Sequence, residues 1–178
     1  MTVWTKALGI VFALTAGMVV SAAARISPQA ALEETIAGTI SATRVITRDA
    51  RLTGNVVCAM TASSCIQFGA SGITLNLNGF TMTGLADPSI GCPEASVPCE
   101  FGIDTNNYSD VTILGPGVVQ QFRNQGIIVR MNTARARVAS VTSSTNCAAG
   151  IILVGSDNLV EDNFLVRNGS PTAACGGV

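Results

Sequence analysis

The dipeptide Gly-Ile recurs at a fixed spacing in the second half of the chain, and this repeat constrains the fold more than any other feature. It stands at 102–103, 126–127 and 150–151, a spacing of 24 residues, and Gly-Val follows at 177–178. Each Gly-Ile is followed by a short aliphatic stretch, a turn rich in Asn, Asp and Ser, and two further β-rich stretches. Short strands separated by turns, with a period in the twenties, are typical of a solenoid. Three strands per repeat and no helical spacing predict an all-β parallel β-helix rather than a leucine-rich repeat.

Equivalent residues of successive turns in such a coil stack in columns, about 4.8 Å apart. Ile103, Ile127 and Ile151 are therefore expected to form one interior column, which suits β-branched side chains. The corner asparagines Asn124, Asn146 and Asn168 are expected to hydrogen-bond from turn to turn as a ladder. Turn propensity alone is the other explanation for these asparagines.

The composition excludes several classes of function. The chain has 178 residues, no histidine, a single lysine (Lys6), 12% charged residues and a net charge of −1. Without histidine or a lysine in the mature chain, Ser-His-Asp and Cys-His catalysis, histidine-based zinc sites and P-loops are excluded. The low charge gives no basic surface for nucleic acid.

Residues 1–24 are typical of a signal peptide. Lys6 precedes an apolar run over 7–20, and the small residues Ala22 and Ala24 form an Ala-x-Ala end. A membrane anchor is the alternative, but the apolar run is short for a bilayer span. We therefore expect cleavage after Ala24, no stable membrane span afterwards, and a secreted or periplasmic protein.

Six cysteines follow this leader, and the even number predicts three disulfides in an oxidising compartment. Spacings of seven residues or more, without histidine, disfavour a metal site. Equivalent positions on adjacent turns predict Cys147–Cys175, with Cys58–Cys65 and Cys92–Cys99 closing local loops. The alternative Cys99–Cys147 stays open, because these two cysteines also share a column.

Residues 25–42 are expected to cap the coil, and residues 43–178 to form the repeats. Ser27 and Pro28 are typical of a helix start, and Leu32 and Ile36 lie on one face of a helix that would run to Gly38. A short amphipathic helix of this kind covers the apolar end of a solenoid. At the other end the chain stops just inside a new repeat, so we expect it to be truncated at the C-terminus.

A family resemblance lies in residues 72–84, Gly-Ile-Thr-Leu-Asn-Leu-Asn-Gly-Phe-Thr-Met-Thr-Gly. This segment resembles the "gitLDLNGhtItG" turn of secreted right-handed β-helix proteins of the pectin-lyase-like class. Residues 110–119 resemble the next turn of that family, and the likeness spans roughly residues 43–178. It implies a right-handed parallel β-helix. The family includes polysaccharide lyases, hydrolases and epimerases, and also proteins known only as β-helix repeats.

The resemblance does not carry a catalytic residue over to this chain. Asn76 stands where the family string has Asp, and Phe80 stands where it has His. A related group binds periplasmic copper, but Met60, Met82 and Met131 without histidine make a poor set of copper ligands. We therefore expect no resident cofactor, and Ca²⁺ only if the chain is a lyase.

Alternation along the strands places the candidate site residues. With Ile103 inward, Asp104 points outward, and Arg130 points outward one turn and one column away, so the two can pair. Lyases of this fold set acidic Ca²⁺ ligands beside an arginine or lysine base, but we interpret Asp104 and Arg130 as a surface ion pair rather than a catalytic pair. The neighbouring outward residues, Ile128, Ile152 and Val154, form an apolar strip that we expect to lie under a missing C-terminal region or another chain.

The sequence thus predicts an exported β-helix module without a recognisable catalytic site. Its role would be structural or carbohydrate-contacting, with polysaccharide as the expected partner. The alternative is the N-terminal fragment of a polysaccharide lyase or hydrolase of the pectin-lyase-like class.

Overall fold

The computed structural model describes residues 32–86 and 99–169, and these residues form fifteen strands and no helix. The strands are β1 (Glu34–Ile40), β2 (Arg44–Ile46), β3 (Ala50–Cys58), β4 (Ser63–Phe68), β5 (Thr74–Asn76), β6 (Thr81–Thr83), β7 (Glu100–Asp104), β8 (Thr112–Leu114), β9 (Val118–Gln120), β10 (Ile127–Val129), β11 (Arg137–Ala139), β12 (Thr142–Ser144), β13 (Ile151–Leu153), β14 (Leu159–Glu161) and β15 (Phe164–Val166).

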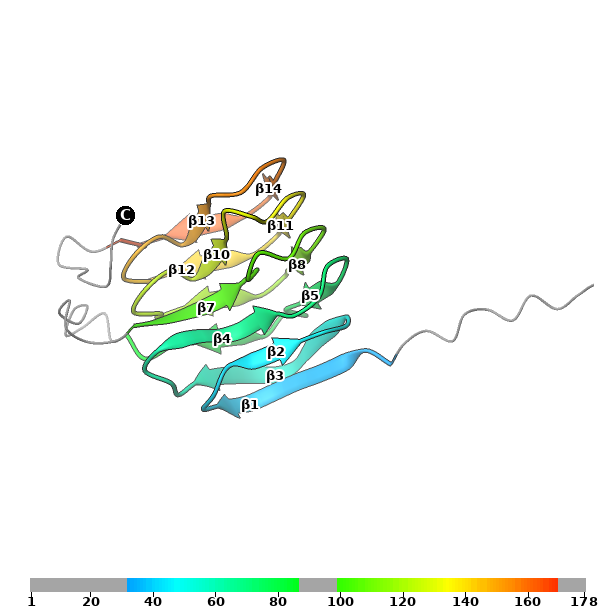
Figure 1. The fold of residues 1–178 in the computed structure, drawn as a ribbon. Helices are drawn as coiled ribbons and strands as arrows, with labels where there is room; N and C mark the ends of the chain where they lie inside the picture. The colour runs from blue at the N-terminus through cyan, green and yellow to red at the C-terminus, as the bar shows by residue number, and fades with distance from the viewer. Residues whose placement is uncertain (1–31, 87–98, 170–178) are drawn as a thin grey trace, which may run out of the picture. The chain divides into compact units, whose positions relative to one another are not determined.

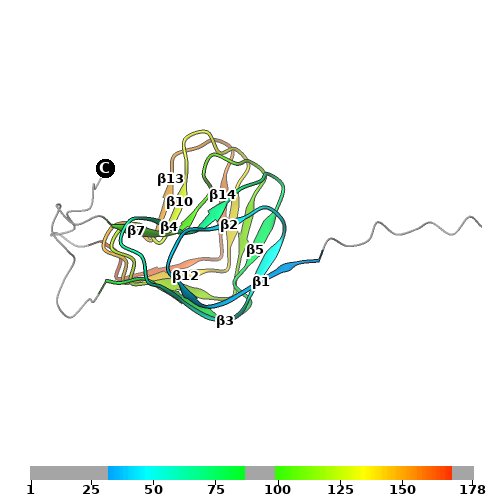
Figure 2. The same ribbon diagram turned by 60° about the horizontal axis from the view of Figure 1, so that its bottom comes forward.

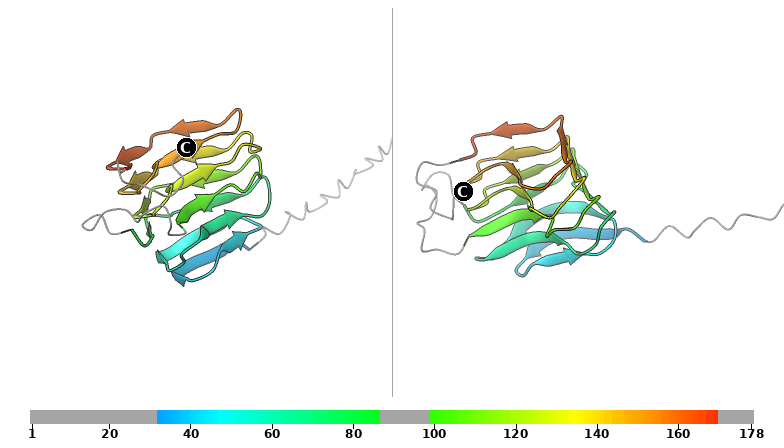
Figure 3. Two further views of the ribbon diagram at one scale, coloured as in Figure 1. Left: turned by 60° about the vertical axis from the view of Figure 1, so that its left-hand side comes forward. Right: turned by 45° about the horizontal axis from the view of Figure 1, so that its top comes forward.

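The strands stack into a coil with three strands per turn. Every strand pair among the described residues is parallel. Strands β2, β4, β7, β10 and β13 form a five-stranded sheet, which is one face of the coil (Figure 1). The other two faces are the β5–β8–β11–β14 and β6–β9–β12–β15 stacks, which β3 joins into a ten-stranded sheet by pairing with both β5 and β6. Figures 2 and 3 show strands of successive turns lying over one another on each face. The all-β class and the three strands per repeat are confirmed.

The isoleucine column predicted from the repeat is confirmed. Ile127 is aligned with Ile103 on one side and with Ile151 on the other. Ile103 and Ile127 are fully buried, and Ile151, on the last described turn, is partly buried against the same core. The alternation of the strand therefore places these residues inside and their immediate successors outside.

The glycine of each Gly-Ile pair stands where neighbouring atoms leave no room for a Cβ. A Cβ on Gly126 would lie 2.6 Å from Ser143 Oγ and 2.7 Å from Asn146 Nδ2. A Cβ on Gly150 would lie 2.6 Å from Asn168 Nδ2. All three distances are shorter than real contacts of a Cβ atom, so at these two positions the repeat keeps glycine where the corner asparagines pack against the strand.

An asparagine ladder occupies these corners, with one correction to its members. Asn146 donates from Nδ2 to Asn168 Oδ1 at 2.8 Å, and the backbone N–H of Phe122 donates to Asn146 Oδ1 at 3.0 Å. The prediction is confirmed for Asn146 and Asn168. It is wrong for Asn124, because the fully buried Phe122 takes the equivalent place on the preceding turn.

The N-terminal helix expected to end at Gly38 is not found. Residues 34–40 form β1, which pairs in parallel with β3, so the coil begins before residue 43. Of the two residues expected on one helix face, Ile36 is buried but Leu32 is 85% exposed, and Ile36 instead shares its buried face of β1 with Ile40. Gly38 adopts a φ of +81° where the register between β1 and β3 shifts. The start of the expected helix, at Ser27, lies outside the described residues.

The disulfide Cys58–Cys65 is confirmed, with its Cα atoms 5.7 Å apart between β3 and β4. Cys99 and Cys147 are disulfide-bonded as well. The predicted pairs Cys92–Cys99 and Cys147–Cys175 each include a cysteine outside the described residues, so they stay predictions. The expected signal peptide and the end of the chain at 177–178 also lie outside. Within the described stretches, no helix with the length and apolarity of a membrane span occurs.

Candidate functional site

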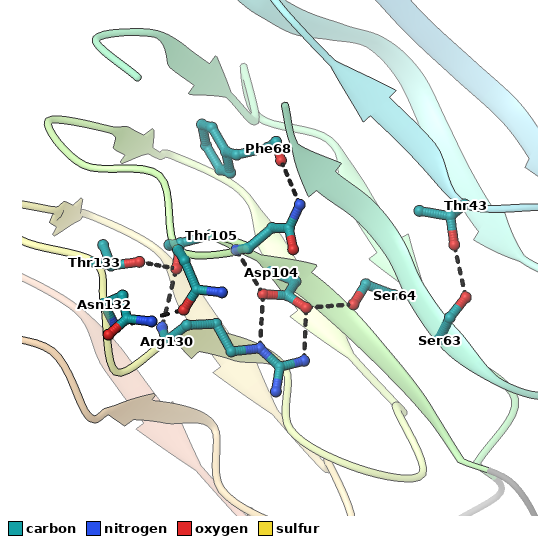
Figure 4. A network of polar contacts seen from close by, with 11 residues as sticks. Thr43, Ser63, Ser64, Phe68, Asp104, Thr105, Arg130, Asn132 and Thr133 are labelled. Atoms are coloured by element: carbon teal, nitrogen blue, oxygen red, sulfur yellow. Dashed lines mark hydrogen bonds and ion pairs between the residues drawn. The ribbon is translucent and has the colours of Figure 1, made fainter. Parts of the chain in front are cut away.

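The candidate residues lie on the outer side of the five-stranded sheet. Asp104, the last residue of β7, is aligned with Ile128 in β10, and Ile128 with Ile152 in β13. This is the outward column predicted from the alternation. Arg130 directly follows β10, so its side chain starts one turn away from Asp104 and reaches back along the sheet (Figure 4).

Asp104 and Arg130 form an ion pair with two hydrogen bonds. Arg130 Nε donates to Asp104 Oδ1 at 3.0 Å, and Nη2 donates to Oδ2 at 2.7 Å. Ser64 Oγ donates to Oδ2 at 2.9 Å, and the backbone N–H of Asn106 donates to Oδ1 at 2.8 Å (Figure 4). Four donors therefore use the roughly four acceptor positions that a carboxylate offers.

These contacts keep the Asp104 carboxylate ionised. Burial raises the pKa of Asp104, but the hydrogen bond from Arg130, the bonds from Asn106 and Ser64, and the positive charge of Arg130 together bring that pKa below its usual value. The hydrogen bond to Asp104 raises the pKa of Arg130 above its usual value. Arg130 is therefore a fixed cation and a poor base.

The expectation that the two residues can pair is confirmed, but only Arg130 of the pair reaches the surface. Asp104 is 1% exposed, whereas the Arg130 side chain is 37% exposed. The guanidinium carbon of Arg130 lies 5.2 Å from the centre of the Phe101 ring, within the range of a cation–π contact. The carboxylate is therefore buried although it points outward from the sheet, and Arg130 and Ser64 are both hydrogen-bonded to it.

A second buried ion pair, which the sequence did not indicate, joins the same strand to the following turn. Glu100 is fully buried, and its Oε2 accepts a hydrogen bond from Arg123 Nε. Its Oε1 accepts hydrogen bonds from the backbone N–H groups of Leu85 at 2.9 Å and Arg123 at 3.2 Å. No motif marks these two residues, and only their spacing of about one repeat could have suggested a contact.

Neither pair belongs to a metal centre in the described part of the chain. Among residues 32–86 and 99–169, no group of three or more His, Cys, Asp or Glu side chains is placed to hold a metal ion. Asp104 and Glu100 are each engaged by an arginine of the next turn.

A pocket of about 290 Å³ lies beside the Asp104–Arg130 pair. Its apolar wall includes Phe101 and the predicted strip Ile128, Ile152 and Val154. The strip is not uniformly exposed, because Ile128 is buried whereas Val154 is 49% exposed. The apolar strip expected from the sequence is therefore one side of a concave site.

Asn124 and Gln125 line the same pocket, and the sequence reasoning missed this role for both. They are 8% and 4% exposed, and Asn124 Oδ1 and Gln125 Oε1 are buried without a hydrogen-bond partner. Backbone bonds hold both residues in place: Asn124 N–H donates to Glu100 O, and Gly102 N–H donates to Gln125 O, each at 3.1 Å. The only available signal was that the next turn has two alanines at the equivalent positions, 148 and 149.

Comparison of the chain with protein-family models, with curated proteins and with solved structures found no match. The chemistry of the site therefore follows from its geometry. The Asp104 carboxylate and the Arg130 guanidinium are hydrogen-bonded to each other. Asn124 and Gln125 each have a carboxamide oxygen without a hydrogen-bond partner, and both residues line the pocket with its apolar wall. Such an arrangement is suited to binding a ligand rather than to acid–base catalysis.

Proposed function

We propose that the chain is an exported, right-handed parallel β-helix module of the pectin-lyase-like class that contacts carbohydrate without transforming it. The observation that carries the proposal is the closed Asp104–Arg130 pair. Its carboxylate accepts four hydrogen bonds, and its cation is held by two of them. A lyase needs an accessible base and free metal ligands, and a glycosidase needs clustered carboxylates.

The coil of parallel strands and the likeness of residues 72–84 support the fold class. That segment supplies β5 and β6, with a tight turn at Asn78 and Gly79 between them, where both residues have positive φ. Right-handedness is expected because parallel strands connected within one sheet follow that hand in nearly all proteins.

Other charged residues of the coil also form ion pairs between neighbouring turns. Arg135 pairs with Asp110 and Arg137 pairs with Glu161, in each case on a neighbouring turn. This use of charge supports a structural scaffold. The disulfide bonds at Cys58–Cys65, Cys99 and Cys147 support an oxidising compartment, as export would provide.

The outer face of the five-stranded sheet supports contact with carbohydrate. Apolar side chains and two carboxamides gather there around one pocket, and the adjacent charges are neutralised within the protein. Sugars combine apolar C–H surface with many hydroxyl groups, so a wall of this mixed character complements them.

The test uses the purified chain and a panel of insoluble and soluble polysaccharides, with Ca²⁺ present. We expect retention on at least one polymer, without release of unsaturated uronates or new reducing ends. Product formation that is lost in Arg130→Ala would overturn the proposal in favour of a lyase or hydrolase. Absence of binding to every polymer would overturn the carbohydrate role.

A further inference from the structure

We infer that the pocket beside Arg130 binds a single uncharged sugar unit, with the carboxamides of Asn124 and Gln125 as its recognition groups. This inference rests on the proposed function, because it names the class of sugar and the residues that would select it.

Two residues that line the pocket carry buried oxygens without hydrogen-bond partners. Asn124 Oδ1 and Gln125 Oε1 are buried with no hydrogen-bond partner. Each such oxygen destabilises a folded protein, and buried polar atoms are otherwise almost always paired. Because both residues line the same pocket, a ligand that brings donors into it would supply the missing partners. The oxygens themselves are buried, so binding requires each carboxamide to rotate about its last side-chain bond and present its oxygen to the pocket.

The charges around the pocket determine which donors fit. Among the described residues, Arg130 is the only charged one that lines the pocket, and Asp104 neutralises Arg130 through two hydrogen bonds. An anionic sugar would place its carboxylate near two carboxamide oxygens without an unpaired cation to receive it. A cationic ligand would meet the guanidinium. Hydroxyl groups satisfy the site without either penalty.

The remaining donors and walls also suit a sugar ring. The bonds to Asp104 use Nε and Nη2 of Arg130, which leaves Nη1 to donate to a hydroxyl oxygen. Phe101, Ile128 and Ile152 provide an apolar wall for the C–H groups of the ring. The volume of about 290 Å³ is near the lower end of the range for ligand pockets, so one unit fits better than an extended chain.

The experiment compares the full chain with the double variant Asn124→Leu/Gln125→Met, in which both amides are replaced by apolar groups of similar size. Gln120→Met is the matched control, because Gln120 lies in β9 of the ten-stranded sheet, away from the pocket. Calorimetric titration would use methyl glycosides of neutral hexoses and the corresponding uronates. Thermal unfolding of all three proteins would be measured in parallel.

We expect the neutral glycoside to bind the full chain and the Gln120→Met variant equally, and to bind the double variant at least about tenfold more weakly. The uronate should bind more weakly than the neutral glycoside. The double variant should unfold at the same temperature or higher, because two unpaired buried oxygens have been removed. A structural role for the amides would lower that temperature, and this result would overturn the inference.

The two proposals fail in different ways. If the full chain and the double variant are retained equally on a polysaccharide, the proposed function stands and the pocket inference falls. If no polymer is retained but the neutral glycoside binds in a pocket-dependent manner, the pocket inference stands and the polymer-contacting function falls. Tighter binding of the uronate would also overturn the inference.

Discussion

Asp104 and Arg130 stand on neighbouring turns of the coil, and the guanidinium spans the two turns to bond both oxygens of the carboxylate at 3.0 and 2.7 Å. Asp110 and Arg135 repeat the same geometry, at 2.6 and 2.7 Å, also across neighbouring turns. The first carboxylate is buried, whereas the side chains of the second pair are 48% and 60% exposed. The molecule therefore contains one kind of ion pair in two environments.

The two arginines should differ in their contribution to stability. Arg130→Met leaves the buried Asp104 carboxylate without its cation, so we expect a loss of about 3 kcal/mol in the free energy of unfolding. Arg135→Met exposes a carboxylate that water already reaches, so this variant should be nearly as stable as the parent. Urea unfolding of both variants measures the difference. Equal losses would contradict a buried role for the Asp104–Arg130 pair.

The stability of the protein should depend on pH through Asp104. The pKa of Asp104 lies below its usual value, so the stabilisation is present above that usual value and is lost as the pH falls through the folded pKa. In Arg130→Met, burial should raise the pKa of Asp104, so this variant should lose stability as the pH rises. The gap between parent and variant should therefore be wider at about pH 6 than at about pH 3.

The control for this pH dependence is the double variant Asp104→Asn/Arg130→Met, which removes the titrating group. Its unfolding free energy, measured over the same pH range, should not show the fall with rising pH that Arg130→Met shows. A gap between parent and Arg130→Met that stays constant with pH would show that Asp104 does not carry the effect.

The glycine of the repeat should not tolerate a methyl group. In Gly126→Ala the new Cβ would approach Ser143 Oγ and Asn146 Nδ2, at 2.6 and 2.7 Å, so we expect a loss of about 1–3 kcal/mol. Gly54→Ala is the control, because its Cβ would meet only the Cβ of Ala37, at 3.2 Å. Thermal unfolding should place Gly126→Ala clearly below Gly54→Ala. The reverse order would mean that the repeat keeps glycine for another reason.

The period and the inward register could be predicted because the same physical constraint recurs on every turn. In each Gly-Ile pair, the glycine has no room for a Cβ and the isoleucine lies in the core, as Gly126 and Ile127 show. The same alternation correctly placed Asp104 outward and within reach of Arg130. The N-terminal helix prediction was wrong because it rested on the spacing of Leu32 and Ile36, and residues four apart share a face in an extended chain as well as in a helix. Leu32 precedes β1 and is 85% exposed, so the two residues form no common apolar face.

The burial of the site could not be predicted in the same way, because it depends on the path of long side chains across turns. Arg130 extends over Asp104 and Phe101, and the sequence spacing does not reveal this. Asn124 was assigned to the ladder from its position near a corner. Phe122 occupies that column, and the displaced Asn124 lines the pocket with Gln125.

The most direct test of the account is the response of the side-chain amides of Asn124 and Gln125 to a neutral sugar. Their N–H₂ signals, assigned by comparison with Asn124→Leu and Gln125→Met, would be followed by nitrogen-edited NMR during titration with the methyl glycoside. We predict selective, saturable shifts for these two amides and none for the ladder amides of Asn146 and Asn168, whose oxygens already have partners. Unchanged signals from Asn124 and Gln125 at saturating sugar, or equal shifts in all four residues, would contradict the account.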